Sequence, residues 1–347
     1  MKYKQGMVAP INLFFMLFIS RTLVVFTVSS SLLGGSYSAD LVISLCIAAV
    51  AVLLLSVPIF IMLAQGKNLL ENRFFSYLYA LYFFFAGAIG LSRFVLFSSS
   101  KLGRAEYPLL LAAVVICAAA YAARLGIEAI SRFGSMVFFI MFGGSVLAAI
   151  FSFNDISSLN YFPLVQNGAE QIIGTAIFAI TSTSEVMLLP VLAPKINGKI
   201  ILPYCLCAAA SLLSIVVTVL TVIGVLGSVA TVAAHPLGML YQIMKFASTE
   251  RLDSLFTAYW IFAIFFKTAL YLYASAQCIK TGSTQRDCII GALGIFAATA
   301  IILKAGIITR GRTLASIIIF LLFSVALPLL YTAFSKRKND IEKIISS

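Results

Sequence analysis

Long apolar runs divide the sequence into ten segments that are separated by short polar connections. Crossing a hydrocarbon core about 30 Å thick takes about 20 helical residues, and most of the runs reach that length. The pattern therefore predicts an all-α polytopic membrane protein that forms one integral membrane domain over 1–347. Its expected spans are 7–33, 41–64, 75–97, 107–123, 133–151, 171–193, 200–227, 255–277, 288–303 and 314–334, followed by a basic cytoplasmic tail over 335–347.

Composition strengthens this interpretation. Apolar residues make up 62% of the chain and charged residues only 10%, whereas soluble domains average about 45–50% and about 25%. Such a chain has far more apolar side chains than the interior of a soluble domain of its length can enclose. A soluble globular protein is therefore excluded, and the lipid bilayer is the expected surrounding.

The net charge of +12 is explained by the connections between the spans. If the amino terminus is cytoplasmic, the inner segments hold fourteen Lys and Arg residues and the outer ones seven. This bias predicts that both termini are cytoplasmic. No basic cluster is interleaved with exposed aromatic residues, so nucleic acid is not an expected partner. The outer connection 228–254 is long enough to hold short helices of its own.

Ten spans with both termini on one side divide into two halves of five. Because five is odd, the second half must be inverted relative to the first. Inverted repeats of this kind are typical of secondary transporters, so the count predicts a transporter architecture.

Polar residues interrupt the first and sixth spans near their middle, at corresponding positions of the two halves. Consecutive hydroxyl side chains offer the backbone alternative hydrogen bonds, and Pro190 and Pro194 limit the helix after the second interruption. Matched interruptions indicate a binding site near the bilayer midplane. Individual hydroxyls can instead bond between packed helices. The candidate ligand-binding residues are Ser20, Arg21 and Thr22 in the first span and Thr181, Ser182, Thr183, Ser184 and Glu185 in the sixth.

Four ionisable residues lie within spans: Arg21, Arg93, Glu185 and Lys267. A charge that faces lipid costs at least about 2.5 kcal/mol, so such residues are expected to face the bundle interior or water. Glu185 is the only acid among them, and we expect it to pair with Lys267 or with Arg21. A purely structural ion pair is the alternative for Lys267. Arg93 lies about one turn from the outer end of its span, where it is expected to snorkel to the interface.

Tyr271 follows Lys267 by four residues, on the same helix face, and completes the set of candidate ligand-binding residues. Sequence motifs of hydrolases, metalloproteases and phosphate-binding loops are absent. A single His and scattered Cys residues do not form a set of metal ligands. We therefore predict no enzymatic activity, no cofactor and no metal.

Two segments resemble the spore germination permease family, the B subunits of nutrient germinant receptors. The first follows the fourth span and reads Arg-Leu-Gly-Ile-Glu-Ala-Ile-Ser-Arg over 124–132, with Gly126, Glu128 and Arg132 as its structural signature. The second comprises Glu-Arg-Leu-Asp-Ser-Leu-Phe over 250–256, Trp260, and Phe-Lys-Thr-Ala-Leu-Tyr over 266–271. Glu128 and Arg132 are also spaced to form an ion pair on a helix surface.

That family is a branch of the amino acid/polyamine/organocation superfamily. The resemblance implies a leucine-transporter-type fold with broken first and sixth helices. It also implies a protein of the spore inner membrane that senses a small nutrient such as an amino acid, in complex with A and C receptor subunits. Lys267 matches the lysine of the family's eighth span.

The chain departs from the superfamily at the interruptions, where transporters usually carry Gly-rich segments. Arg21 stands at the first interruption, and its guanidinium could bind a ligand carboxylate directly. The leading hypothesis is a nutrient-sensing receptor subunit whose ligand shifts a conformational equilibrium that partner subunits detect. The alternative is a secondary active amino acid transporter coupled to protons or cations, in which Lys267 or Glu185 titrates.

Overall fold

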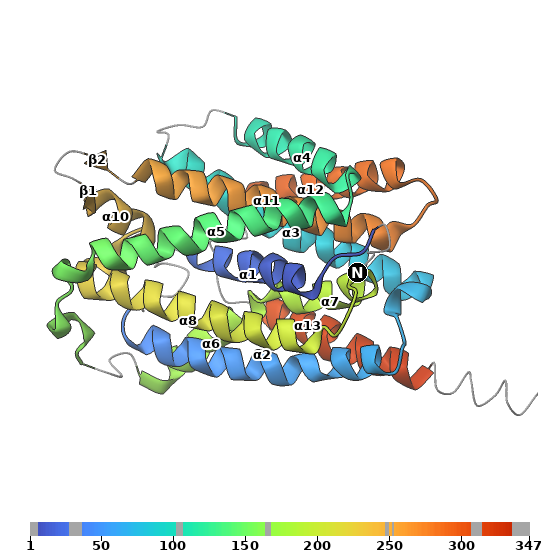
Figure 1. The fold of residues 1–347 in the computed structure, drawn as a ribbon, viewed down its shortest axis with the longest axis horizontal. Helices are drawn as coiled ribbons and strands as arrows, with labels where there is room; N and C mark the ends of the chain where they lie inside the picture. Colours follow the sequence, from blue (N-terminus) through green and yellow to red (C-terminus); the bar gives the residue numbers. More distant parts are fainter. Residues whose placement is uncertain are drawn as a thin grey trace, which may run out of the picture.

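The computed structural model describes residues 6–27, 37–101, 107–163, 168–246, 250–251, 253–306 and 314–334. They form a bundle whose helices run along the long axis of the molecule (Figure 1). Eight helices are long and apolar enough to cross a membrane. Two shorter apolar helices, Pro10–Val24 and Pro108–Arg124, occupy the predicted first and fourth spans. The expectation of an all-α polytopic membrane protein is confirmed.

The helices of the bundle follow the predicted spans in order. They are α1 (Pro10–Thr27), α2 (Asp40–Ala64), α3 (Arg73–Lys101), α4 (Pro108–Arg124), α5 (Ile127–Phe151), α6 (Gly168–Thr181), α8 (Ile201–Leu226), α11 (Asp253–Ile279), α12 (Thr284–Ala305) and α13 (Leu314–Leu321), which continues as a π-helical turn over Leu322–Ala326 and ends at Phe334.

Short elements occupy the connections. The predicted outer connection 228–254 holds α9 (Val229–Val232) and α10 (Pro236–Ile243), as expected, and the two-residue strands β1 (Lys245–Phe246) and β2 (Glu250–Arg251). 3-10 turns lie at Leu69–Glu71, Phe153–Asp155 and Ser158–Tyr161.

The fifth helix begins earlier than its apolar run suggests. The run begins at 133, whereas α5 begins at Ile127. Gly126 immediately precedes it with a φ of 91°, a conformation that favours glycine. This residue allows the chain to turn sharply from the end of α4 into α5, so the polar first turn of α5 is helical although its hydropathy is low.

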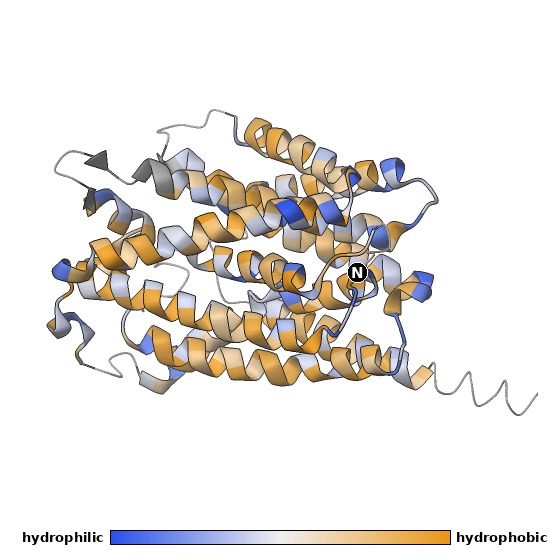
Figure 2. Ribbon diagram, viewed as in Figure 1, coloured by the Kyte–Doolittle hydropathy of each residue, from blue (hydrophilic) through white to orange (hydrophobic). Residues whose placement is uncertain are grey.

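The start of α1 and the end of α13 lie at the same end of the bundle, and α10 and both strands lie at the other end (Figure 1). Hydrophilic residues gather mostly toward these two ends, and the helix middles are hydrophobic (Figure 2). This arrangement agrees with spans that end on the two sides of a membrane. The predicted tail, 335–347, and the predicted end of the first span, 28–33, lie outside the described residues.

Helix α11 is the centre of the bundle, where it contacts α1, α3, α4, α5 and α12. Small residues allow neighbours to approach it closely. A Cβ at Gly134 of α5 would lie 2.6 Å from Cε2 of Phe266, and a Cβ at Gly87 of α3 would lie 3.4 Å from Cβ of Tyr271. Lys267 therefore stands on the most enclosed helix, between residues that neighbouring helices contact closely.

Candidate functional site

The sixth predicted span is broken at its centre. Helix α6 ends at Thr181, and the chain continues through a 3-10 turn (Ser184–Leu188), the four-residue helix α7 (Leu189–Leu192) and a second 3-10 turn (Ala193–Lys195). At the break, Thr183 Oγ1 donates to the carbonyl of Ala179 at 2.9 Å. The hydroxyl run and the two prolines that follow it account for the break, as predicted.

The expected interruption of the first span is wrong for the described residues, because α1 is continuous through Ser20, Arg21 and Thr22. Thr22 Oγ1 donates to the carbonyl of Phe18, one turn earlier, at 2.8 Å. A single back-bonding Thr is compatible with an intact helix, and no proline follows it in the span. Arg is also a good helix former.

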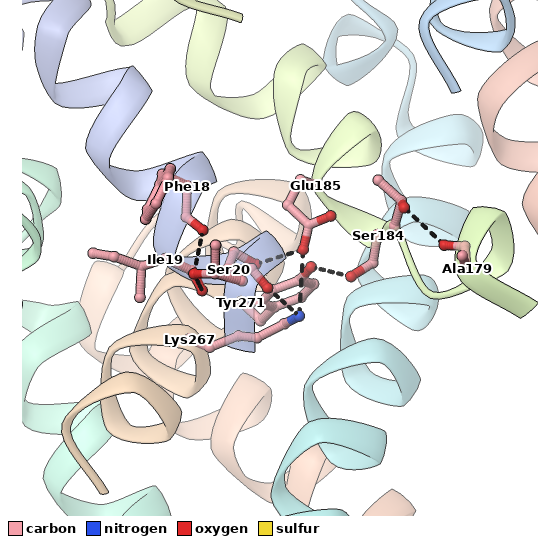
Figure 3. Close-up of polar contacts among 10 residues, drawn as sticks. Phe18, Ile19, Ser20, Ala179, Ser184, Glu185, Lys267 and Tyr271 are labelled. Carbon is pink, nitrogen blue, oxygen red and sulfur yellow. Dashed lines mark hydrogen bonds and ion pairs between the residues drawn. The ribbon is translucent and has the colours of Figure 1, made fainter. Parts of the chain in front are cut away.

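An ion pair joins the broken span to α1 and α11 (Figure 3). Lys267 Nζ lies 3.4 Å from Glu185 Oε1 and donates to the Ser20 carbonyl at 2.9 Å. Ser20 Oγ donates to the same carboxylate oxygen at 2.9 Å. The pair is buried, with exposed side-chain fractions of 8% and 3%. The expectation that Glu185 pairs with Lys267 or with Arg21 is therefore confirmed, and the partner is Lys267.

Tyr271 extends this polar cluster on the same face of α11. The Lys267 ammonium lies 5.5 Å from the centre of the Tyr271 ring, a cation–π distance. The Tyr271 hydroxyl hydrogen bonds with the Ser184 hydroxyl (Figure 3). Both residues that follow the break, Ser184 and Glu185, are thus held by side chains of α1 or α11.

A cavity of about 400 Å³ lies beside the cluster. Its volume is within the range of small-molecule sites, about 300–1,000 Å³. Four predicted site residues line it: Thr181, Ser182, Ser184 and Lys267. The remaining lining comes from α1, α3, α6, α12 and α13 and is mainly apolar. It comprises Leu23, Val24, Leu81, Tyr82, Phe85, Ala86, Ile89, Gly90, Arg93, Phe178, Ile302, Ser316, Ile319, Phe320 and Phe323.

Arg21 and Thr183 are not in the lining of this cavity. They line a small neighbouring pocket of about 50 Å³ between α1, α2, α6 and α8, which shares Val24 and Ser182 with the cavity. Within the part of the chain that the structure describes, Arg21 makes no hydrogen bond or ion pair. The structure therefore brings Ser20, Glu185, Lys267 and Tyr271 together and places Arg21 outside the cavity.

Arg93 is a cavity residue that the sequence interpretation missed, because its position near the helix end suggested snorkelling. Its guanidinium lies 5.8 Å from the centre of the Phe178 ring, and its Nε is buried. The sequence feature that indicates an inward-facing Arg93 is its spacing from Tyr82, Ala86 and Gly90, which places all four residues on one face of α3. Small residues on that face indicate that it points into the bundle.

The signature residues Gly126, Glu128 and Arg132 lie at the start of α5, separate from the cavity. Glu128 Oε1 accepts a hydrogen bond from the Gly6 backbone at 2.7 Å. Among the described residues Glu128 and Arg132 form no ion pair, so that expectation is wrong. Instead, the backbone N–H of Gly6 donates to the Glu128 carboxylate, and this hydrogen bond links the residues before α1 to α5.

Comparison with known proteins gives one finding. The profile of the spore germination protein family matches residues 60–307, which is most of the chain and includes both the broken span and Lys267. No curated protein matches the sequence.

Proposed function

This chain belongs to the spore germination protein family, and from that premise we propose that it is the membrane subunit of a germinant receptor that binds a small nutrient inside the bundle. The single observation that carries the proposal is the cavity of about 400 Å³ at the break of the sixth span, beside a buried ion pair. Irregular backbone in a bilayer is tolerated where it lines a cavity. The nutrient we propose is an amino acid.

If both termini are cytoplasmic, the cavity extends from the middle of the bundle toward its outer end. Its lining residues on α1, Leu23 and Val24, follow Ser20 toward the outer end, and those on α6 precede the break. On α13 the lining begins at Ser316, near the outer end of that helix. A nutrient outside the spore inner membrane is therefore on the same side of the membrane as the outer end of the cavity. This position suits a sensor of external compounds.

Signalling follows from the way the ion pair connects three elements. Glu185 belongs to the broken span, Lys267 to α11, and both contact Ser20 of α1. A ligand that displaces Ser184 or Lys267 would change the relative positions of these elements. We propose that A and C receptor subunits detect this change. A ligand shifts such an equilibrium only as far as it prefers one state over the other.

Direct binding tests the proposal. The full-length protein, reconstituted with its A and C subunits in nanodiscs, is titrated with each of the 20 amino acids by calorimetry. Saturable binding of at least one amino acid is the expected result. Absence of binding for all of them would contradict the proposal.

Secondary transport is the second candidate, and one observation favours it. The Lys267 ammonium takes a backbone carbonyl and a carboxylate as partners, which are oxygen ligands that also bind metal cations. The ammonium could thus stand in for a coupling cation. Robust uptake of an amino acid by this chain alone in proteoliposomes, together with normal germination of a deletion strain, would favour the transporter over the receptor.

A further inference from the structure

We propose that Arg93 is the carboxylate anchor of the cavity and that the ligand is an amino acid with an apolar side chain. This inference rests on the proposed function, because it concerns the ligand of the same cavity. It adds the residue that binds the ligand's anionic end and the class of side chain that the ligand carries.

The charges around the cavity single out Arg93. Two cations line it, Lys267 and Arg93, and its lining includes no acidic residue. The charge of Lys267 is matched by Glu185. Among the described residues Arg93 has no carboxylate partner, and its buried Nε makes no hydrogen bond. A charge inside the bundle that has no partner of opposite sign is costly, so an anionic group in the cavity would complete a favourable arrangement.

Arginine is suited to this role by its geometry. The guanidinium presents its N–H donors in a fixed fork that matches the two oxygens of a carboxylate. The neighbouring Phe178 ring, whose centre lies 5.8 Å from the guanidinium carbon, limits the positions the guanidinium can adopt. Preorganisation of this kind lowers the entropy that binding must overcome.

The other lining residues indicate where the ammonium group and the side chain of the ligand would lie. Phe178 is one turn before Thr181, at the carboxyl end of the 14-residue helix α6. The dipole of a helix favours a cation at this end, and the hydroxyls of Thr181 and Ser182 lie there. An α-amino acid held by Arg93 would thus present its ammonium toward favourable partners. Phe320, Phe323 and Ile89 offer only apolar surface to its side chain.

Ligand analogues test the carboxylate anchor without any change to the protein. The reconstituted wild-type receptor is titrated with L-leucine and L-phenylalanine, and with their carboxamides, which keep the ammonium and the side chain but lack the carboxylate. We expect at least one of the two acids to bind about 10- to 100-fold more tightly than its amide, the range for losing a hydrogen bond to a charged group. An amide that binds as tightly as its acid would overturn the inference.

Variants of the two intramembrane arginines provide a matched comparison. In Arg93→Gln we expect the affinity for the acid to fall to that for the amide, and Arg93→Lys should recover part of the difference. Arg21→Gln removes an arginine that lies outside the cavity and should leave both affinities within about threefold of wild type. Equal losses in Arg93→Gln and Arg21→Gln would contradict a specific role for Arg93. Elution as a monodisperse peak shows that each variant is folded.

The outcomes separate this inference from the function on which it rests. If none of the 20 amino acids binds, the proposed function fails and the inference fails with it. If polar or cationic amino acids bind and both apolar ones do not, the inference alone is wrong. If an apolar amino acid binds and Arg93→Gln retains its full affinity, a carboxylate anchor at Arg93 is excluded while ligand binding stands.

Discussion

The first and sixth spans carry similar residues in their centres and fold differently. Each has a charged residue beside hydroxyl residues, Arg21 in the first span and Glu185 in the sixth. Helix α1 remains continuous through its polar residues, whereas the sixth span ends its α-helix at Thr181 and continues as short turns. A matched position in the sequence thus does not produce a matched break.

The difference shows what a break requires. In α1 two hydroxyls flank an arginine, and Thr22 bonds to its own helix. In the sixth span four consecutive hydroxyl residues are followed by Pro190, which cannot donate a backbone hydrogen bond. The two spans therefore contribute differently to the site. Helix α1 provides the regular backbone that holds Lys267 through the Ser20 carbonyl, and the broken span provides the hydroxyl residues Thr181, Ser182 and Ser184 of the cavity lining.

The largest effect is expected from Lys267→Ala, which removes the cation that joins the two spans. The variant leaves the Glu185 carboxylate buried without its ion-pair partner, and breaking such a pair costs about 3–5 kcal/mol. We expect a loss of this size in the free energy of unfolding in bicelles and a loss of the nutrient response, with the protein still present in the membrane. A normal response would contradict a role for Lys267 at the site.

A double variant is the control for the ion pair. Lys267→Ala combined with Glu185→Gln removes both charges of the pair, so most of the lost stability should return while the nutrient response stays absent. If the double variant is as unstable as Lys267→Ala, the instability arises from lost packing of the lysine stem. In that case the ion pair is not what holds the spans together.

A smaller effect is expected from Ser20→Ala. The change removes the hydroxyl that donates to Glu185 and keeps the backbone carbonyl that binds Lys267. A hydrogen bond to a charged group contributes about 1.5–3 kcal/mol, so the unfolding free energy should fall by that amount. An unchanged unfolding curve would show that the Ser20 hydroxyl does not connect α1 to the broken span.

The smallest effect is expected from Thr22→Val, the matched control on the same helix. The Thr22 hydroxyl bonds only to backbone carbonyls within α1, so its loss should change the unfolding free energy by less than about 1 kcal/mol. The same unfolding measurement serves for both variants. A loss equal to that of Ser20→Ala would remove the distinction between a hydroxyl that joins two spans and one that stays within its own helix.

Hydropathy was sufficient to predict the helices, because every predicted span contains an apolar helix in the structure. The scarcity of intramembrane charge was sufficient to predict that Glu185 has a basic partner. The choice of Lys267 over Arg21 could not be predicted, since it depends on how each helix is rotated about its axis. The same rotation places Arg93 in the cavity and Arg21 in the neighbouring pocket, and an apolar run carries little information about it.

The central claim is that the cavity beside the broken span binds the nutrient, and a cavity-filling variant tests it most directly. Ala86→Phe places an aromatic ring in this cavity. Ala120→Phe does the same in a groove of similar volume, about 400 Å³, between α4 and α12. Amino acid binding is measured by calorimetry on the reconstituted wild type and both variants. The prediction is saturable binding to the wild type and to Ala120→Phe, with none to Ala86→Phe. Equal affinity in all three proteins would contradict it.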